Sequence, residues 1–234
     1  MKTSTFAPTV PASAAKQTPR TFFSRTSARS SAVYSAILIP LLLLSACSDD
    51  SKPATEKPEV KGPELITARS GFQKLYVAAR TLNPDAKPYR IESTVTSDGN
   101  GQDGKWAIWR ASFASAASHS TKPYFWSGSA ADGAPSRGIN PGTEDSYSPS
   151  NSSTQVFDMA FLKIDSDQAF AAAQKHGGDK IIEKDPKISI LYVCDWNHNT
   201  NELTWHVTYG PTRDASKLTV AVNASTGEFI RVEK

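Results

Sequence analysis

The hydrophobic pattern divides the chain into a leading apolar run, a polar stretch and a longer patterned region that begins at Glu64. The run Ala32–Leu44 has about 13 residues, fewer than the roughly 20 that a helix needs to span a bilayer. Residues 48–63 are rich in Pro, Lys, Glu and Ser, so they cannot bury enough surface to offset the entropy of ordering. We therefore predict a tether over residues 47–63, able to reach about 50 Å when extended.

Residues 64–127 read as a first helix-and-strand unit. Apolar residues from Leu65 to Leu82 recur at spacings of three and four, which predicts an amphipathic helix that stops at Asn83-Pro84. Extended runs follow at 89–95, 105–113 and 122–126. The middle run is aromatic on both faces, which is typical of a central strand. Its Trp106 and Trp109 should point to opposite faces, so at least one is expected outside the core of its own unit.

Residues 155–234 repeat this order. Asp165 and Gln168 have the spacing of a capping box, and Gly177-Gly178 is a natural end for the helix that follows. Extended runs come at 188–196, 202–209, 217–222 and 228–232. The intervening residues 128–154 are rich in Ser, Gly and Pro and exceed the usual loop length, so we expect a linker or long surface loop there.

The two regions match at nearly constant offsets. The alternating residues 107–113 lie 96 positions before 203–209, and Ala78-Ala79 lies 94 positions before Ala172-Ala173. A duplicated unit is the simplest explanation of this match. The expected fold class is therefore α+β, with two similar units, each a helix packed on a small antiparallel sheet.

The leading apolar run has the three parts of a secretory signal: basic residues before it, an apolar core, and small residues at its end. Because Leu44-Ser45-Ala46 is followed by Cys47, it resembles the lipobox of bacterial lipoproteins. That resemblance implies removal of residues 1–46 and acylation of Cys47, which becomes the first residue of a membrane-anchored protein. Ser48 in the second position implies sorting to the outer membrane, facing the periplasm.

Removing this signal changes the charge of the protein. The chain has 26 basic and 23 acidic residues, and residues 1–46 hold five of the basic ones, which leaves the remainder at −2. A clustered basic face is what nucleic-acid binding requires, so no nucleic-acid partner is expected. With Cys47 acylated, Cys194 has no partner for an internal disulfide, and its apolar strand predicts that it packs in the core.

The last 70 residues carry a family resemblance. The helix that opens with DSDQAFAAAQKHGG and the later LTVAVNASTGEFIRVEK resemble a PepSY domain, with Asn223 in place of the usual aspartate of the Asp-Ala-x-Thr-Gly turn. Residues 64–127 resemble it only in the order of their elements, which implies a degenerate tandem pair. The resemblance implies an extracytoplasmic α+β module, of a kind found in peptidase propeptides and cell-surface proteins, and it supplies no catalytic residues.

Two stretches could carry chemistry. Asp98–Gly104 has oxygen ligands at alternate positions, but Asp103 and Trp109 stand where a calcium loop needs glycine and glutamate, so a turn is favoured. Asp195, His198 and His206 could converge across a hairpin, although zinc sites usually need three or four supported ligands. No nucleophile elbow, phosphate-binding loop, dinucleotide fingerprint or HExxH motif is present.

These observations favour a membrane-anchored, non-enzymatic binding or inhibitory module, with an envelope protein or a peptidase as partner and no metal or other cofactor. A small periplasmic hydrolase or metal-dependent enzyme that uses Asp195, His198 and His206 is the alternative. A binding module could accept an extended peptide at an exposed strand edge. The candidate edges are Glu228–Glu233 and Lys122–Trp126.

Overall fold

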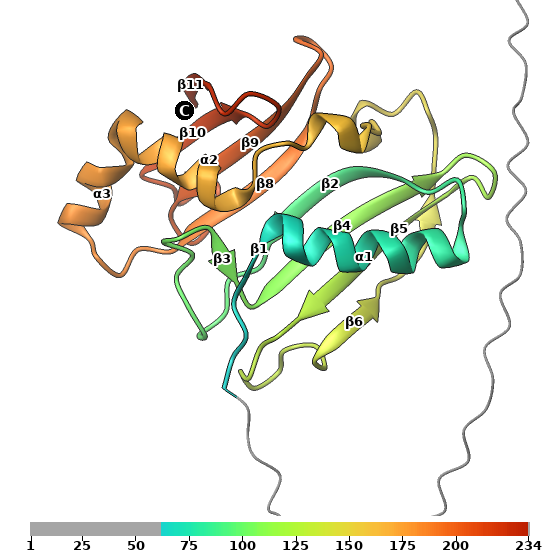
Figure 1. The fold of residues 1–234 in the computed structure, drawn as a ribbon, viewed down its shortest axis with the longest axis horizontal. Coiled ribbons are helices and arrows are strands. Elements are labelled where there is room, and N and C mark those ends of the chain that lie inside the picture. The colour runs from blue at the N-terminus through green and yellow to red at the C-terminus, as the bar shows by residue number, and fades with distance from the viewer. Residues whose placement is uncertain (1–61, 234) are drawn as a thin grey trace, which may run out of the picture. The chain divides into compact units, whose positions relative to one another are not determined.

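The computed structural model describes residues 62–233, which form an α+β fold with a mostly antiparallel sheet (Figure 1). The helices are α1 (Ala68–Leu82), α2 (Ser166–Ala173), α3 (Asp179–Lys184), the short 3-10 helices η1 (Ser152–Thr154) and η2 (Met159–Phe161), and the wide turn η3 (Gln174–Gly178). The strands are β1 (Ile66–Thr67), β2 (Lys87–Ser93), β3 (Lys105–Trp106), β4 (Ile108–Ser115), β5 (Ser120–Ser127), β6 (Gly138–Pro141), β7 (Asp145–Ser146), β8 (Ile190–Asn197), β9 (Glu202–Tyr209), β10 (Leu218–Asn223) and β11 (Phe229–Glu233).

Nine of the strands form one sheet. Its order is β11-β10-β9-β8-β2-β4-β5-β6, with β7 pairing to β5, and every one of these pairs is antiparallel. At its centre β2 pairs with β8, each being the first strand that its half contributes to this sheet, and Ile91 lies opposite Cys194. The expected pair of small sheets is therefore wrong: backbone hydrogen bonds between β2 and β8 join them into a single sheet.

Both long helices pack on one face of this sheet. Figure 1 shows α1 lying across β4 and β5 and α2 lying across β9 and β10. The apolar stripe predicted for α1 faces inward, since Phe72, Leu75 and Ala79 are all at most 1% exposed. Side chains from both halves belong to one hydrophobic cluster, so the described residues share one core.

In both halves, a tryptophan of the sheet hydrogen-bonds to the segment that leads into the helix. The indole N–H of Trp109 on β4 donates to the carbonyl oxygen of Ile66 (2.8 Å), and that of Trp205 on β9 donates to the carbonyl oxygen of Ile164 (3.0 Å). In each half the acceptor lies two residues before the helix begins. The tryptophans keep the predicted offset of 96, but the helix starts differ by 98, so the predicted helical offset of 94 is wrong.

The N-termini of α1 and α2 meet. Asp165 and Gln168 form the predicted capping box on α2. The same Asp165 carboxylate also accepts from the backbone N–H of Arg69 (2.9 Å), and the Ser166 hydroxyl accepts from that of Ala68 (2.9 Å). Thr67, at the N-cap position of α1, forms no side-chain cap of its own. One side chain therefore caps two helices from different halves.

Two local predictions are corrected by the strands. The expected strand over 105–113 is interrupted at Ala107, which separates β3 from β4. Because of this break, Trp106 and Trp109 are both fully buried in the common core rather than on opposite faces, and the Trp106 indole N–H donates across the junction to Ile190 (2.8 Å). The expected linker 128–154 also contributes β6 and β7, which pair along β5 and cover it.

The predicted signal segment 1–46, the lipidation site Cys47 and most of the tether lie outside residues 62–233. Among the described helices, none is both long and apolar enough to cross a membrane.

Candidate functional site

The sheet face opposite α1 and α2 carries a band of charged side chains, which we call the open face. Antiparallel register aligns them across the strands: Arg110 of β4 lies opposite Glu92 of β2, and Arg90 of β2 lies opposite Asp195 of β8. Alternation along β2 explains the pattern, because Ile91 enters the core between Arg90 and Glu92. Neither α1 nor α2 packs on this face, and the short helix η1 reaches only its border beside Arg90.

Ion pairs hold the central part of the band in place. Glu92 lies between two arginines, 2.8 Å from Nε of Arg90 and 2.7 Å from Nη1 of Arg110. Arg90 also reaches across the junction of the two halves, with Nη1 3.6 Å from Asp195. Since arginine has a rigid donor fork, these contacts fix its position and orientation.

His206 continues the band between two carboxylates. Its Nε2 lies 3.3 Å from Asp195 and its Nδ1 lies 2.7 Å from Glu233, whose second oxygen is 2.6 Å from Arg231. Burial opposes a charge on His206, but the hydrogen bonds to Asp195 and Glu233 outweigh burial and raise its pKa to about 9. The hydrogen bond from His206 lowers the pKa of Glu233. At neutral pH the imidazolium therefore donates a hydrogen bond to Glu233 and forms an ion pair with Asp195.

Two hollows flank Arg90 on this surface. One, of about 210 Å³, is lined by Arg90, Glu92, Ser93, Leu191, Val193, His206, Thr208 and Arg213. The other, of about 180 Å³, is lined by Tyr89, Arg90, Ser152, Ser153, Gln155, Asp195 and Trp196. Arg90 borders both, so it marks the centre of the candidate site.

The charges of the band do not balance. Its cations are Arg90, Arg110, Arg213, Arg231 and His206, and its carboxylates are Glu92, Asp195 and Glu233. Within this band the cations therefore exceed the carboxylates by two, which favours an acidic partner.

The arrangement offers little for nucleophilic chemistry. A histidine that stays protonated until about pH 9 cannot take a proton at neutral pH. Among residues 62–233, no serine, threonine or cysteine side chain hydrogen-bonds with His206. His198 does not join Asp195 and His206, because it is exposed in the turn after β8. Within the same residues, no group of three or more His, Cys, Asp or Glu side chains is placed to hold a metal ion.

The other candidates from the sequence have structural roles. Cys194 is fully buried, and desolvation raises the pKa of its thiol well above the ordinary value. The loop 98–104 is tied to the sheet: the carbonyl of Asn100 accepts from Ile190 N–H (2.7 Å), and that of Gly101 accepts from the Tyr192 hydroxyl (2.6 Å). The Asp98 carboxylate accepts hydrogen bonds from the Ser129 hydroxyl and from the backbone N–H of Ala130.

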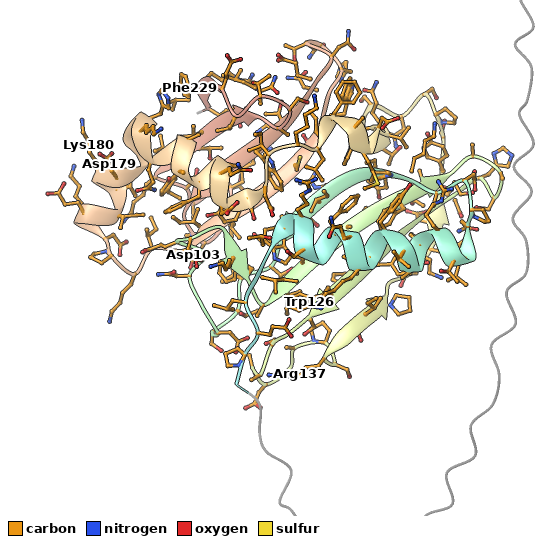
Figure 2. All side chains as sticks on the ribbon, in the orientation of Figure 1. Asp103, Trp126, Arg137, Asp179, Lys180 and Phe229 are labelled. Carbon is orange, nitrogen blue, oxygen red and sulfur yellow. The ribbon has the colours of Figure 1, made fainter. Side chains whose placement is uncertain are left out.

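The sequence also proposed two strand edges. The segment Glu228–Glu233 contains β11, which does form one edge of the sheet. Lys122–Trp126 lies within β5, between β4 and β6, so it is not an edge and that prediction is wrong. On β11, Phe229 (labelled in Figure 2) is 38% exposed. Its ring stacks on that of His176, with ring centroids 3.8 Å apart.

The turn at Asn223 behaves as its sequence predicts. Its side-chain oxygen accepts from the backbone N–H groups of Ser225 (2.8 Å) and Thr226 (3.1 Å), and Gly227 has φ of +79°. Asparagine thus supplies the acceptor that this turn needs without the charge of aspartate.

Sequence reasoning missed most of the open face. Arg90, Glu92, Arg110 and Glu233 come from three separate strands, and no motif connects them. The available signal was the alternation of charged and apolar residues in β2. It shows that Arg90 and Glu92 share a face but not which distant side chains meet them.

No protein-family model matches this chain, so the PepSY resemblance of residues 165–234 stays a prediction. No curated protein matches it either. Among solved structures, the chain is similar to that named "putative lipoprotein (CD1622)" from Clostridium difficile 630, with a TM-score of 0.46 and 9% identity. The alignment covers 70% of this chain and 91% of the other. A similarity of that degree assigns no family.

Proposed function

We propose that this protein is a lipid-anchored, extracytoplasmic binding module that recognises an acidic patch on an envelope protein or peptidase through its open face. The observation that carries the proposal is the fixed, net-positive band centred on Arg90, on the sheet face that α1 and α2 leave uncovered. Charges held in advance by ion pairs lose little freedom when a partner binds.

The anchor rests on the lipobox-like segment and Cys47. Mass spectrometry of the mature N-terminus should find an acylated Cys47, and Cys47→Ala should leave uncleaved precursor. Each buried CH₂ adds about 0.8 kcal/mol, so several acyl chains hold the protein firmly on a membrane. A soluble mature protein that starts at another residue would contradict the anchor. Fractionation to the inner membrane would contradict the outer-membrane part.

A photo-crosslinking residue at Val193, which lines the larger hollow, tests the recognition surface in intact envelopes. We expect it to capture a discrete partner, while the same residue at Val77, 66% exposed on α1, should not. Arg90→Glu combined with Arg213→Glu should remove the captured product, whereas Lys180→Glu on α3 should leave it. A product from Val77 alone would show that the helical face is the interface.

Binding at the β11 edge is a separate outcome of this experiment. Val232 is 48% exposed on that edge strand, so a crosslinker there reports on strand addition. Capture from Val232 but not from Val193 would replace the open face by the edge as the binding surface.

The same protein tests the alternative of an enzyme. Broad hydrolase screening of the purified full chain should detect no turnover, because His206 is held as a cation and is not available as a base. Turnover that disappears in both His206→Ala and Asp195→Ala would overturn the binding-module proposal in favour of catalysis.

A further inference from the structure

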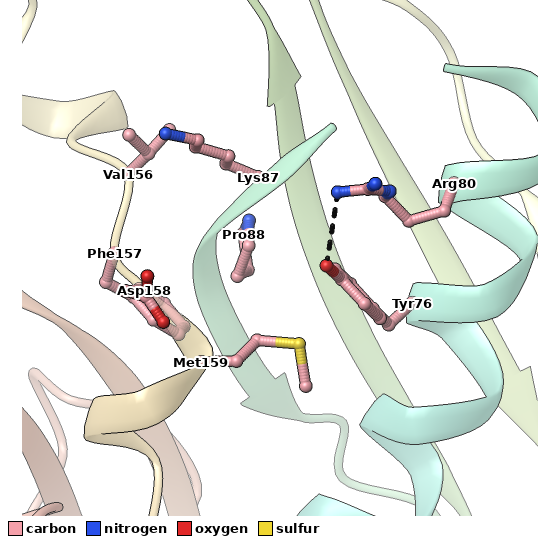
Figure 3. A pocket seen from close by; sticks show the side chains of 8 residues that line it. All are labelled: Tyr76, Arg80, Lys87, Pro88, Val156, Phe157, Asp158 and Met159. Atoms are coloured by element: carbon pink, nitrogen blue, oxygen red, sulfur yellow. Dashed lines mark hydrogen bonds between the residues drawn. The ribbon is translucent and has the colours of Figure 1, made fainter. Parts of the chain in front are cut away.

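A recess separate from the two hollows of the open face lies between α1, the start of β2 and the segment 156–159 (Figure 3). Its volume is about 240 Å³, and the residues lining it are Tyr76, Arg80, Lys87, Pro88, Val156, Phe157, Asp158 and Met159. It shares no lining residue with the two hollows beside Arg90, so it is independent of the proposed recognition surface.

The walls of this recess are held by the fold. The backbone N–H of Phe157 donates to the carbonyl of Pro88 (2.9 Å), and the Phe157 side chain is 3% exposed in the core. The Asp158 carboxylate accepts from Ala160 N–H (2.8 Å), so it is engaged in capping η2. The segment that forms one wall is therefore anchored by its backbone and by a buried ring.

Two cations line this space. Figure 3 shows Arg80 of α1 reaching toward Tyr76, while the side chain of Lys87, at the start of β2, extends toward Val156 on the other wall. Arg80 has one long hydrogen bond, from Nη1 to the Tyr76 hydroxyl (3.4 Å). Among residues 62–233, neither cation forms an ion pair with a carboxylate, and Arg80 keeps most of its five N–H donors free.

The surfaces between the cations are largely apolar. Pro88, Met159 and the ring of Tyr76 border the recess, and a methionine thioether adapts readily to the shape of a bound group. Sites for drug-sized molecules usually have about 300–1,000 Å³, so this recess suits something smaller.

We propose that the recess binds a small organic anion, a carboxylate or phosphate attached to a short apolar group. Arg80 holds the oxyanion through charge-assisted hydrogen bonds, which are stronger than neutral ones, and the positive charge of Lys87 on the other wall adds to the attraction. The apolar group packs against Pro88 and Met159. Inorganic ions lack that second contact and bind more weakly.

Methionine NMR gives a direct test, because the sequence contains only Met1 and Met159. The full chain, labelled with ¹³C-methyl methionine and held in nonionic detergent, is titrated with 3-phenylpropionate, phenyl phosphate and the neutral 3-phenylpropanamide. At least one of the two anions should shift the Met159 resonance saturably, and the amide should bind at least tenfold more weakly. A response to one anion alone supports the proposal and identifies the oxyanion.

Charge-removing variants complete the experiment. Arg80→Gln with Lys87→Gln should weaken anion binding at least tenfold, while Lys175→Gln with Lys180→Gln should change it less than twofold. Lys180 lies on α3, far from the C-terminal end of α1 (Figure 2). Unchanged melting of both variants shows that the fold is intact. Equal binding of the amide, no effect of the first variant, or equally tight binding of inorganic phosphate would overturn the proposal.

Discussion

The carboxylate of Asp165 accepts a hydrogen bond from the backbone N–H of Arg69 (2.9 Å), although 96 residues separate them. It also accepts from the N–H of its own neighbour Ser166 (2.7 Å). The donors at the start of a helix have no partner within that helix, so both α1 and α2 depend on this one side chain. The contact joins the halves at the point where their helices begin.

Asp165→Ala should therefore destabilise the protein more than the loss of an ordinary cap. We expect a cost of about 2–3 kcal/mol in unfolding free energy, against the roughly 1 kcal/mol that is typical of one helix cap. Asp165→Asn keeps the acceptor oxygen and should cost less. Asp158→Ala, which removes the cap of η2 alone, is the matched control for chemical denaturation. Equal effects at positions 165 and 158 would contradict the double cap.

Replacing Trp109 or Trp205 should lower the unfolding free energy by similar amounts. Trp109→Phe and Trp205→Phe each remove an indole N–H and leave the carbonyl of Ile66 or Ile164 without its donor. Trp126, 3% exposed and without an indole hydrogen bond among the described residues, is the control for lost ring volume. We expect both variants to lose about 1–3 kcal/mol more than Trp126→Phe in denaturant unfolding. A loss of unfolding free energy no larger than that of Trp126→Phe would show that the two indole hydrogen bonds do not stabilise the fold.

Stability should depend on pH through His206. Its pKa is raised from 6.5 in the unfolded chain to about 9 in the fold, so its contribution is complete below pH 6.5 and disappears between pH 6.5 and 9. The shift corresponds to about 3 kcal/mol. The lowered pKa of Glu233 acts in the opposite sense and is lost as the pH falls below its ordinary value of 4.5. Together they favour maximal stability near pH 5–6.5.

Comparison of His206→Gln with the wild-type protein measures the contribution of protonated His206 to the unfolding free energy. The difference in unfolding free energy should be largest at pH 6 and should shrink by about 3 kcal/mol at pH 9.5. His198→Gln, at a histidine exposed in the turn after β8, is the control for replacing a histidine. A His206→Gln difference that is constant with pH would show that the imidazole is not held as a cation.

A nick in the connecting segment should leave the protein in one piece. A protease site inserted between the exposed Asp132 and Gly133 separates the halves covalently, but β6 on the far side of the cut still pairs with β5. Pairing of β2 with β8 adds a second connection. We expect the nicked fragments to elute together in gel filtration and to unfold in one transition. Separation under native conditions would restore the expectation of two independently folding units.

The sequence alone determined the local structure to a large extent. The three-and-four spacing of apolar residues predicted α1, alternation predicted most strands to within a few residues, and the Asp165–Gln168 spacing predicted the capping box. It also predicted that Cys194 is buried and that 98–104 forms a turn. These features depend on residues close together in the chain, whose geometry is set by backbone periodicity and turn chemistry.

Only the tertiary structure decided which distant residues meet. Pairing of β2 with β8 turned two expected sheets into one, and it placed Arg90 against Asp195 in the centre of the open face. His206 acquired Glu233 as its partner, while His198, closer in sequence, stayed in solvent. Periodicity shows which face a side chain occupies but carries no information on which strand becomes its neighbour. The neighbours of each strand are set by the burial of both halves in one core. The same packing places residues 156–159 beside α1 and so forms the recess between them.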